Sequence, residues 1–126
     1  MLLDTHVFLW ATNDVERLSP TAVTAVQNPA NEVLVSIASA WEIAIKVSIG
    51  KFKMPTPLAP YLQRLLARHG FTLLPIRFSH LQALEKLPLH HRDPFDRLLV
   101  AQAIDEDATL ITVDSQLRRY RVRTIR

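Results

Sequence analysis

Two short apolar runs, each ending at an aspartate, constrain the fold of this chain most strongly. Met1–Leu3 leads into Asp4, and Leu110–Val113 leads into Asp114. Both runs are predicted to be buried strands, and right-handed crossovers bring the carboxyl ends of parallel strands to one edge of a sheet. We therefore expect Asp4 and Asp114 at one edge, where ligands of open α/β sheets collect. Capping of a helix over Thr5–Trp10 is the alternative role for Asp4.

Helical and strand patterns alternate between these two runs. Further strands are expected at Glu32–Ser36, Phe71–Leu74 and Val122–Ile125, and helices at Pro20–Gln27, Ile37–Ile49, Leu58–Arg68, Ser79–Leu87 and Pro94–Asp105. No repeat or linker interrupts the alternation, and 126 residues suit one domain. The pattern therefore predicts a single α/β domain over residues 1–126 with a largely parallel sheet.

The expected helix Ile37–Ile49 is unusually apolar. Large apolar side chains recur in it at every fourth residue: Ile37, Trp41, Ile45 and Ile49. This spacing predicts a helix that is buried on most sides, with Gly50 as its C-cap. Trp41, like Trp10, lies in an apolar helical pattern, so we expect both rings to pack in the core and not to stack on nucleic-acid bases.

Glu42 is the one acid of this apolar helix, and two readings remain open for it. A surface ion pair with Lys46, four residues on, would explain both side chains. A buried carboxylate, by contrast, would need a partner elsewhere. If the helix leans across the sheet, Glu42 reaches the edge where Asp4 and Asp114 are expected.

The start of the helix Pro94–Asp105 carries two more acids. Asp93 fits the N-cap and Asp96 the first turn, behind a proline at the first helical position. Capping is sufficient to explain Asp93, whereas Asp96 is also placed to reach the same sheet edge. Two neighbouring histidines, His90 and His91, precede them, but adjacent loop histidines do not easily point into one site, so neither is expected to be a metal ligand.

Carboxylates held close together repel one another unless they are protonated or bind a cation. The four that converge here are Asp4, Glu42, Asp96 and Asp114. Oxygen ligands without any cysteine favour Mg²⁺ or Mn²⁺ over zinc, and such an ion supports attack of water on a phosphoryl group. The acids therefore predict hydrolysis of a phosphodiester.

Charge and hydropathy limit the remaining classes of protein. The net charge is +3, and five arginines within the last nine residues leave the first 117 residues at −2. These arginines either keep an exposed edge strand from pairing with other chains or contact a polyanion. We expect no signal peptide, because no charged segment precedes an apolar core after Met1, and no membrane span, because no apolar run reaches about 18 residues. We therefore expect a cytoplasmic protein.

The acidic segments resemble, in order, the motifs of PIN-domain ribonucleases, and most closely those of VapC-like toxins. The segments are Leu3–His6, Trp41–Lys46, His91–Ala103 and Leu110–Asp114. The resemblance implies a three-layer α/β/α sandwich with a mainly parallel sheet of four to five strands. It also implies a metal-dependent endoribonuclease, a homodimer and inhibition by a small antitoxin.

The same resemblance implies a role for each site residue. Metal binding falls to the four acids already named, with Asp114 bound directly or through water. Thr5 and Thr112 match hydroxyls that hold a water or a phosphate oxygen, and Asp93 lies behind the ligands or caps the helix. Lys46, Arg97 and the terminal arginines are expected to attract the RNA backbone.

Two rival functions are considered. A PIN-like module that only binds nucleic acid or regulates would have lost acids, yet all four are present. An aspartyl-phosphate phosphatase would usually carry a second acid two residues after the first, where this chain has His6. RNA cleavage is therefore the prediction, with the inactive module as the alternative.

Overall fold

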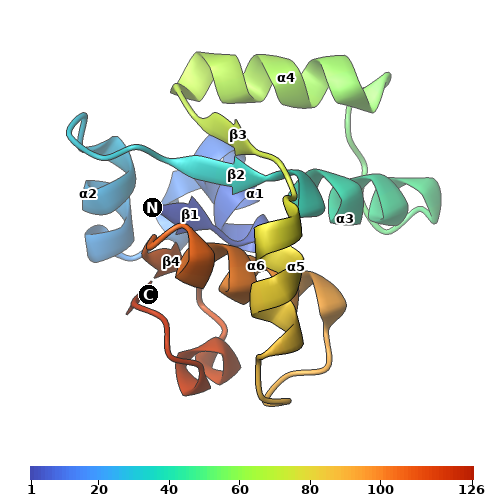
Figure 1. Ribbon diagram of the computed structural model, residues 1–126. Coiled ribbons are helices and arrows are strands. Elements are labelled where there is room, and N and C mark those ends of the chain that lie inside the picture. Colours follow the sequence, from blue (N-terminus) through green and yellow to red (C-terminus); the bar gives the residue numbers. More distant parts are fainter.

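The computed structural model describes all residues 1–126 and contains one sheet of five parallel strands in the order β3-β2-β1-β4-β5 (Figure 1). The strands are short: β1 Leu2–Leu3, β2 Leu34–Ser36, β3 Thr72–Leu74, β4 Leu110–Ile111 and β5 Thr124–Ile125. β1 lies at the centre, with Leu3 paired to Val35 of β2 and to Ile111 of β4. The predicted parallel sheet is confirmed, and β5 is an edge strand as expected.

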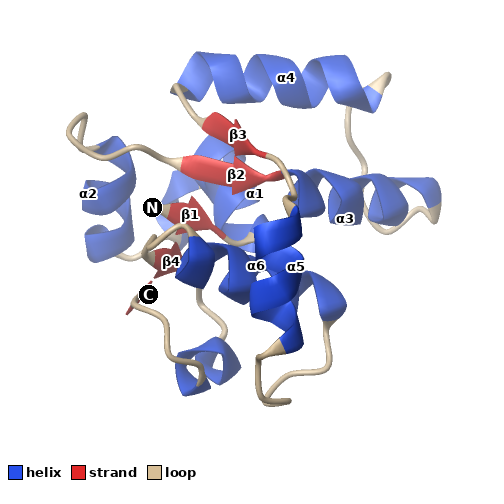
Figure 2. Ribbon diagram, viewed as in Figure 1, coloured by secondary structure: helices blue, strands red, loops and turns tan.

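Six α-helices and two 3-10 turns connect the strands (Figure 2). The helices are α1 Thr5–Asn13, α2 Pro20–Gln27, α3 Ile37–Ser48, α4 Leu58–His69, α5 Phe78–Glu85 and α6 Pro94–Asp105, and the turns are η1 Val15–Arg17 and η2 Ser115–Arg119. Each predicted element is present, with ends shifted by a few residues. η1 was not predicted, because its single turn is too short for an apolar period.

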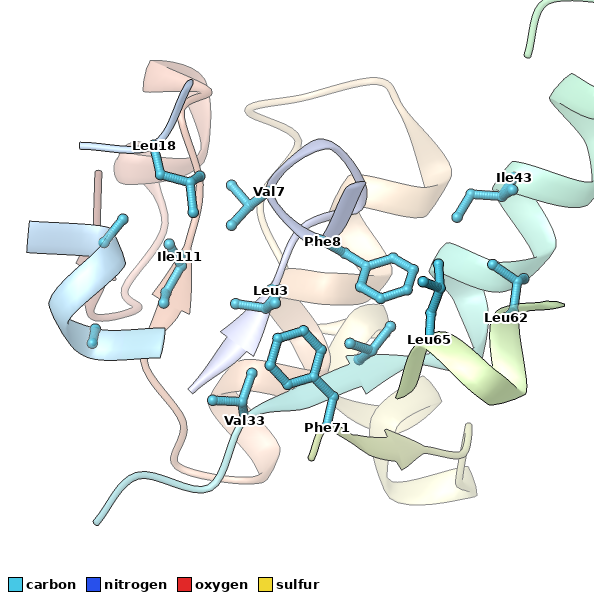
Figure 3. Close-up of a cluster of buried hydrophobic side chains, with 13 residues drawn as sticks. Leu3, Val7, Phe8, Leu18, Val33, Ile43, Leu62, Leu65, Phe71 and Ile111 are labelled. Atoms are coloured by element: carbon cyan, nitrogen blue, oxygen red, sulfur yellow. The ribbon is translucent and has the colours of Figure 1, made fainter. Parts of the chain in front are cut away.

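The two faces of the sheet bury separate cores, because successive side chains of a strand point to opposite faces. Leu3 and Ile111 face a cluster with Val7, Phe8 and Phe71, beneath α1 and α4 (Figure 3). On the other face, Leu2 and Leu110 pack with side chains of α6 and η2: Leu99, Val100, Ala103 and Leu117. The three-layer α/β/α sandwich is thereby confirmed.

Local signals in the sequence set where the helices begin and end. Ser36 accepts a hydrogen bond from the Ala38 N–H at 3.0 Å and caps α3. At the other end Gly50 has φ +79°, and the Lys51 N–H donates to the Lys46 carbonyl at 2.8 Å. That left-handed residue lets the chain close the last turn and leave the helix. The path of α3 beside the sheet edge is therefore encoded at both ends.

The prediction that α3 is buried on most sides is wrong. The stripe at every fourth residue faces outward, with Trp41 57% and Ile49 61% exposed. The buried face instead carries small and polar residues, namely Ala38, Ser39, Glu42 and Ile43. Core packing of Trp41 is likewise wrong, whereas Trp10 packs against the core as expected. The apolar repeat therefore lies on the exposed side of α3, because the side that faces the sheet edge carries Glu42.

None of the helices has the length and apolar character that a membrane crossing requires.

Candidate metal centre at the carboxyl edge of the sheet

A small cavity of about 170 Å³ lies at the carboxyl ends of β1 and β4 and holds all four predicted acids. Its lining residues are Asp4, Thr5, His6, Glu42, Lys46, Asp93, Asp96, Val113 and Asp114. Two larger hollows, of about 660 and 790 Å³, lie elsewhere and gather no comparable set of acids. The sheet edge predicted from the strand ends is therefore where the acids converge.

Asp4 serves the fold and the cavity together. It is 6% exposed, and its Oδ1 accepts the Val7 N–H at 2.8 Å, which caps α1. Its Oδ2 accepts the hydroxyl of Thr112, a buried residue of the strand end next to it. Burial raises the pKa of Asp4 above its ordinary value, although these two hydrogen bonds oppose the rise. Capping and a place in the site are therefore compatible roles.

Glu42 is held by one donor at each oxygen. Thr5 donates its hydroxyl to Oε1 at 2.7 Å, and the Lys46 ammonium donates to Oε2 at 2.8 Å. The Glu42 side chain is only 8% exposed, so this ion pair differs from a solvated surface pair. The predicted partner Lys46 is present, but the surface pair is wrong: Glu42 is a buried acid of the cavity.

Asp96 differs from the other acids because no hydrogen bond reaches its carboxylate. The nearest donor is the His91 Nε2, 3.5 Å from Oδ2. Burial, followed by the neighbouring charge of Asp93, raises the pKa of Asp96 to about 7. Asp93 itself caps α6, with Oδ1 accepting the N–H groups of Phe95 at 2.8 Å and Asp96 at 3.1 Å. Asp96 is thus the acid with most to gain from a cation.

Asp114 is bonded at both oxygens. Oδ1 accepts the Gln116 N–H at 2.9 Å, and Oδ2 lies 2.9 Å from the His91 Nε2. Sequence reasoning set His91 aside, yet its ring nitrogen lies within 4.8 Å of both the Asp96 and Asp114 oxygens. The only available signal was its position two residues before the N-cap Asp93.

Arg97 does not line the cavity. Its Nη2 donates to the Leu87 carbonyl at 3.3 Å, which holds the loop before α6, and its Nε is buried without a partner. Lys46 is thus the basic side chain that lines the cavity beside the acids.

The donor set fits a hard divalent cation. The cavity gathers five carboxylates with Asp93 included, against the single ammonium of Lys46. Carboxylate and hydroxyl oxygens suit Mg²⁺ or Mn²⁺, and the charges of Asp4 and Glu42 both act on Asp96 in this cavity. Burial first, and then the neighbouring acids, raise the pKa of Asp96, so its carboxylate is unfavourable there without an ion.

The chain matches a known protein family. The family model described as PIN domain matches residues 1–122. The chain belongs to the PIN domain family.

This PIN domain is 34% identical over 122 residues to Ribonuclease VapC22 of Mycobacterium tuberculosis, which covers 96% of this chain and 92% of that protein. It is also 42% identical to Ribonuclease VapC16 of the same organism over 55 residues, which cover 44% of this chain and 39% of that protein. The expected resemblance to PIN-domain VapC proteins is confirmed.

Solved structures share the fold. The VapBC2 complex from Rickettsia felis, bound to a promoter DNA fragment, matches with a TM-score of 0.72 at 18% identity, over 98% of this chain and 96% of that one. A toxin-antitoxin complex from Klebsiella pneumoniae matches with a TM-score of 0.64 at 14% identity, over 99% and 95%. At these identities the matches establish the architecture.

Proposed function

We propose that this PIN domain is a divalent-metal-dependent endoribonuclease, the toxin of a toxin–antitoxin pair. The observation that carries the proposal is the cavity in which Asp4, Glu42, Asp96 and Asp114 meet, with Asp96 lacking any hydrogen-bond donor. The similarity to a ribonuclease over nearly the whole chain supports RNA as the substrate. The chemistry is hydrolysis of a phosphodiester bond.

Some residues would hold the ion, and others orient those ligands. Asp4, Glu42 and Asp96 would hold Mg²⁺, or Mn²⁺ in its place, with Asp114 directly or through water. The ion supplies Lewis acidity toward water and toward the phosphoryl oxygens. Thr5 and Thr112 fix the orientation of Glu42 and Asp4 through their hydroxyls.

The RNA backbone would meet basic side chains in the cavity and in a second hollow. Lys46 lines the cavity itself, although Glu42 shares its charge. The hollow of about 790 Å³ next to the histidine loop is lined by Lys86, Arg119 and Arg121, none of which has a carboxylate within ion-pair distance. Phosphate contacts by these side chains would make affinity depend on salt.

The inactive module has less support. A PIN-like protein that had lost its chemistry would not need four acids packed against their own repulsion, and all four are present in one cavity. Burial, with a smaller contribution from neighbouring acids, raises the pKa values of Asp4 and Asp96, so keeping both as carboxylates is unfavourable without an ion.

RNA cleavage with purified protein tests the proposal. Wild type should cut a mixed RNA substrate when Mg²⁺ or Mn²⁺ is added and stop when EDTA removes the ion. Asp4→Asn and Asp96→Asn should each lose cleavage, while Asp105→Asn, a matched change at the far end of α6, should cut normally. Failure of the wild type to cut any RNA with either ion would remove the enzyme function.

We also propose a homodimer, a small antitoxin as partner, and action in the cytoplasm. The two structural matches are toxin-antitoxin complexes, which supports an antitoxin here. The apolar side chains exposed on α3, together with Phe78 at 91% exposure, support a protein partner. Light scattering should give twice the 14.4 kDa chain mass, and a monomer at micromolar concentration would oppose the dimer.

A further inference from the structure

The loop before α6 is fixed to the segment after β4 at two places. The Tyr120 hydroxyl accepts the backbone N–H groups of His90 at 3.1 Å and His91 at 3.0 Å. Tyr120 is 4% exposed and packs in the core with Leu2 and Leu117. The second connection is the His91 ring on Asp114. The loop is therefore held at Asp114 and Tyr120, the two residues that flank η2.

The hydrogen bonds of the His91 ring identify its tautomer. The Asp93 N–H donates to Nδ1 at 2.9 Å, so Nδ1 presents a lone pair and the hydrogen sits on Nε2. Nε2 then donates to Asp114 Oδ2 at 2.9 Å, with Asp96 Oδ2 at 3.5 Å. A nitrogen that carries a hydrogen has no lone pair for a metal. The ring is arranged to donate to the acids and not to ligate an ion.

We propose that His91 is a positioning residue of the metal centre: its Nε2–H holds the Asp114 carboxylate against the cavity and reduces the repulsion between Asp114 and Asp96. The role rests on the proposed function, since it concerns the same metal centre. Asp114 gains from such a partner, because its side chain is 34% exposed. Without the His91 donor, the Gln116 N–H at Oδ1 would hold the carboxylate, and Oδ2 would be left to water.

The connection continues beyond Asp114. The Asp114 N–H donates to the Thr112 Oγ1 at 3.1 Å, and the Thr112 hydroxyl donates to Asp4. A shift of Asp114 therefore disturbs the hydrogen bond that orients a second acid. Groups that orient metal ligands typically change metal affinity by about 10- to 100-fold when removed.

Mn²⁺ binding, measured by EPR titration in the absence of RNA, tests this role. His91→Ala should weaken Mn²⁺ binding by about 10- to 100-fold. His91→Gln keeps an N–H donor near the position of Nε2 and should bind closer to wild type than to His91→Ala. Tyr120→Phe removes the acceptor that fixes the loop and should show a smaller loss in the same direction. His90→Ala, the matched control on the same loop, should bind as wild type does, because its ring lies against Tyr120 and contacts no acid.

The outcomes separate the two proposals. Equal Mn²⁺ affinity in wild type and His91→Ala would overturn the positioning role while leaving the metal centre intact. A directly coordinated nitrogen in the electron spin echo modulation of the wild type, absent from His91→Gln, would make His91 a ligand and also overturn it. Wild type that binds no Mn²⁺ would contradict the proposed function itself.

Discussion

Two clusters in this protein each join one histidine to two acids, and only one of them lies in a cavity suited to a metal. His80 accepts the Arg77 N–H at Nδ1 and donates from Nε2 to Glu106 at 2.9 Å. His91 accepts the Asp93 N–H at Nδ1 and donates to Asp114 at the same distance. Residue types and ring geometry are nearly identical in the two clusters.

The clusters differ in how many donors their acids have. At the junction of α5 and α6, Ser79 donates to Asp105 at 2.8 Å, and Glu106 has both the His80 ring and the Arg77 guanidinium, at 3.7 Å. At the sheet edge Asp96 has no donor within hydrogen-bond distance and faces further acids. The first cluster joins two helices, and the second leaves charge for a cation. We therefore expect the balance between acids and donors to distinguish the proposed metal centre from a structural cluster.

The largest expected effect of this difference is on catalysis. Asp96→Asn should lower RNA cleavage by about 100-fold or more, because removing a ligand costs at least what removing an orienting group costs. Asp105→Asn, at the other end of the same helix, should leave cleavage unchanged. Initial rates on one RNA with Mn²⁺ compare the two. Similar losses in both variants would mean that the acids act through α6 and not through an ion.

Folding stability should depend more on the His80 cluster than on the His91 cluster. His80→Ala should lower the free energy of unfolding by roughly 2–4 kcal/mol, because the fully buried ring leaves a cavity and unpaired partners between α5 and α6. His91→Ala should cost less than about 1 kcal/mol, since its surroundings are partly open to water. Urea unfolding without metal measures both values. A larger loss for His91 than for His80 would reverse the assignment of structural and functional clusters.

The pH dependence of stability should come from the sheet edge. The pKa of Asp96 rises from 3.8 to about 7 on folding, so between these values the folded protein binds a proton that the unfolded chain has lost. Stability without metal should therefore fall as pH rises from about 4 to about 7. Asp96→Asn should remove this part of the fall, and Mg²⁺ should oppose it in wild type. Identical pH profiles for the variant and wild type in EDTA would contradict the raised pKa.

The smallest effect is expected at Asp93, which caps α6 and also lines the cavity. Asn caps a helix about as well as Asp, so Asp93→Asn should change the free energy of unfolding by no more than about 0.5 kcal/mol, whereas Asp93→Ala should cost about 1 kcal/mol. Cleavage should fall only modestly in Asp93→Asn. A loss as deep as that of Asp96→Asn would make Asp93 a ligand of the ion.

Local sequence signals predicted most of the fold. Strand ends at Asp4 and Asp114, the N-cap Asp93 and the left-handed Gly50 all act within a few residues, so they can be read from the chain. The parallel direction of the strands followed from the alternation of elements, whereas their order in the sheet, β3-β2-β1-β4-β5, was not predicted. Each acid was placed by the element that carries it, because the carboxyl ends of parallel strands share an edge.

Contacts between distant segments could not be predicted in the same way. The period of Ile37, Trp41, Ile45 and Ile49 identifies a helix but not which side faces the sheet, and the buried side turned out to carry Glu42. The place of His91 depends on Tyr120, 29 residues later, whose hydroxyl fixes the loop. The buried side of α3 and the place of His91 both depend on packing between the layers of the fold. No local sequence pattern predicts that packing.

An anomalous difference map from a crystal soaked in Mn²⁺ tests the central claim most directly. The claim is that the acids without enough donors, and not simply acids beside a histidine, hold the ion. We predict one peak in the cavity between Asp4, Glu42 and Asp96, and none beside His80. A peak at His80, Asp105 and Glu106 with an empty sheet edge would contradict the account.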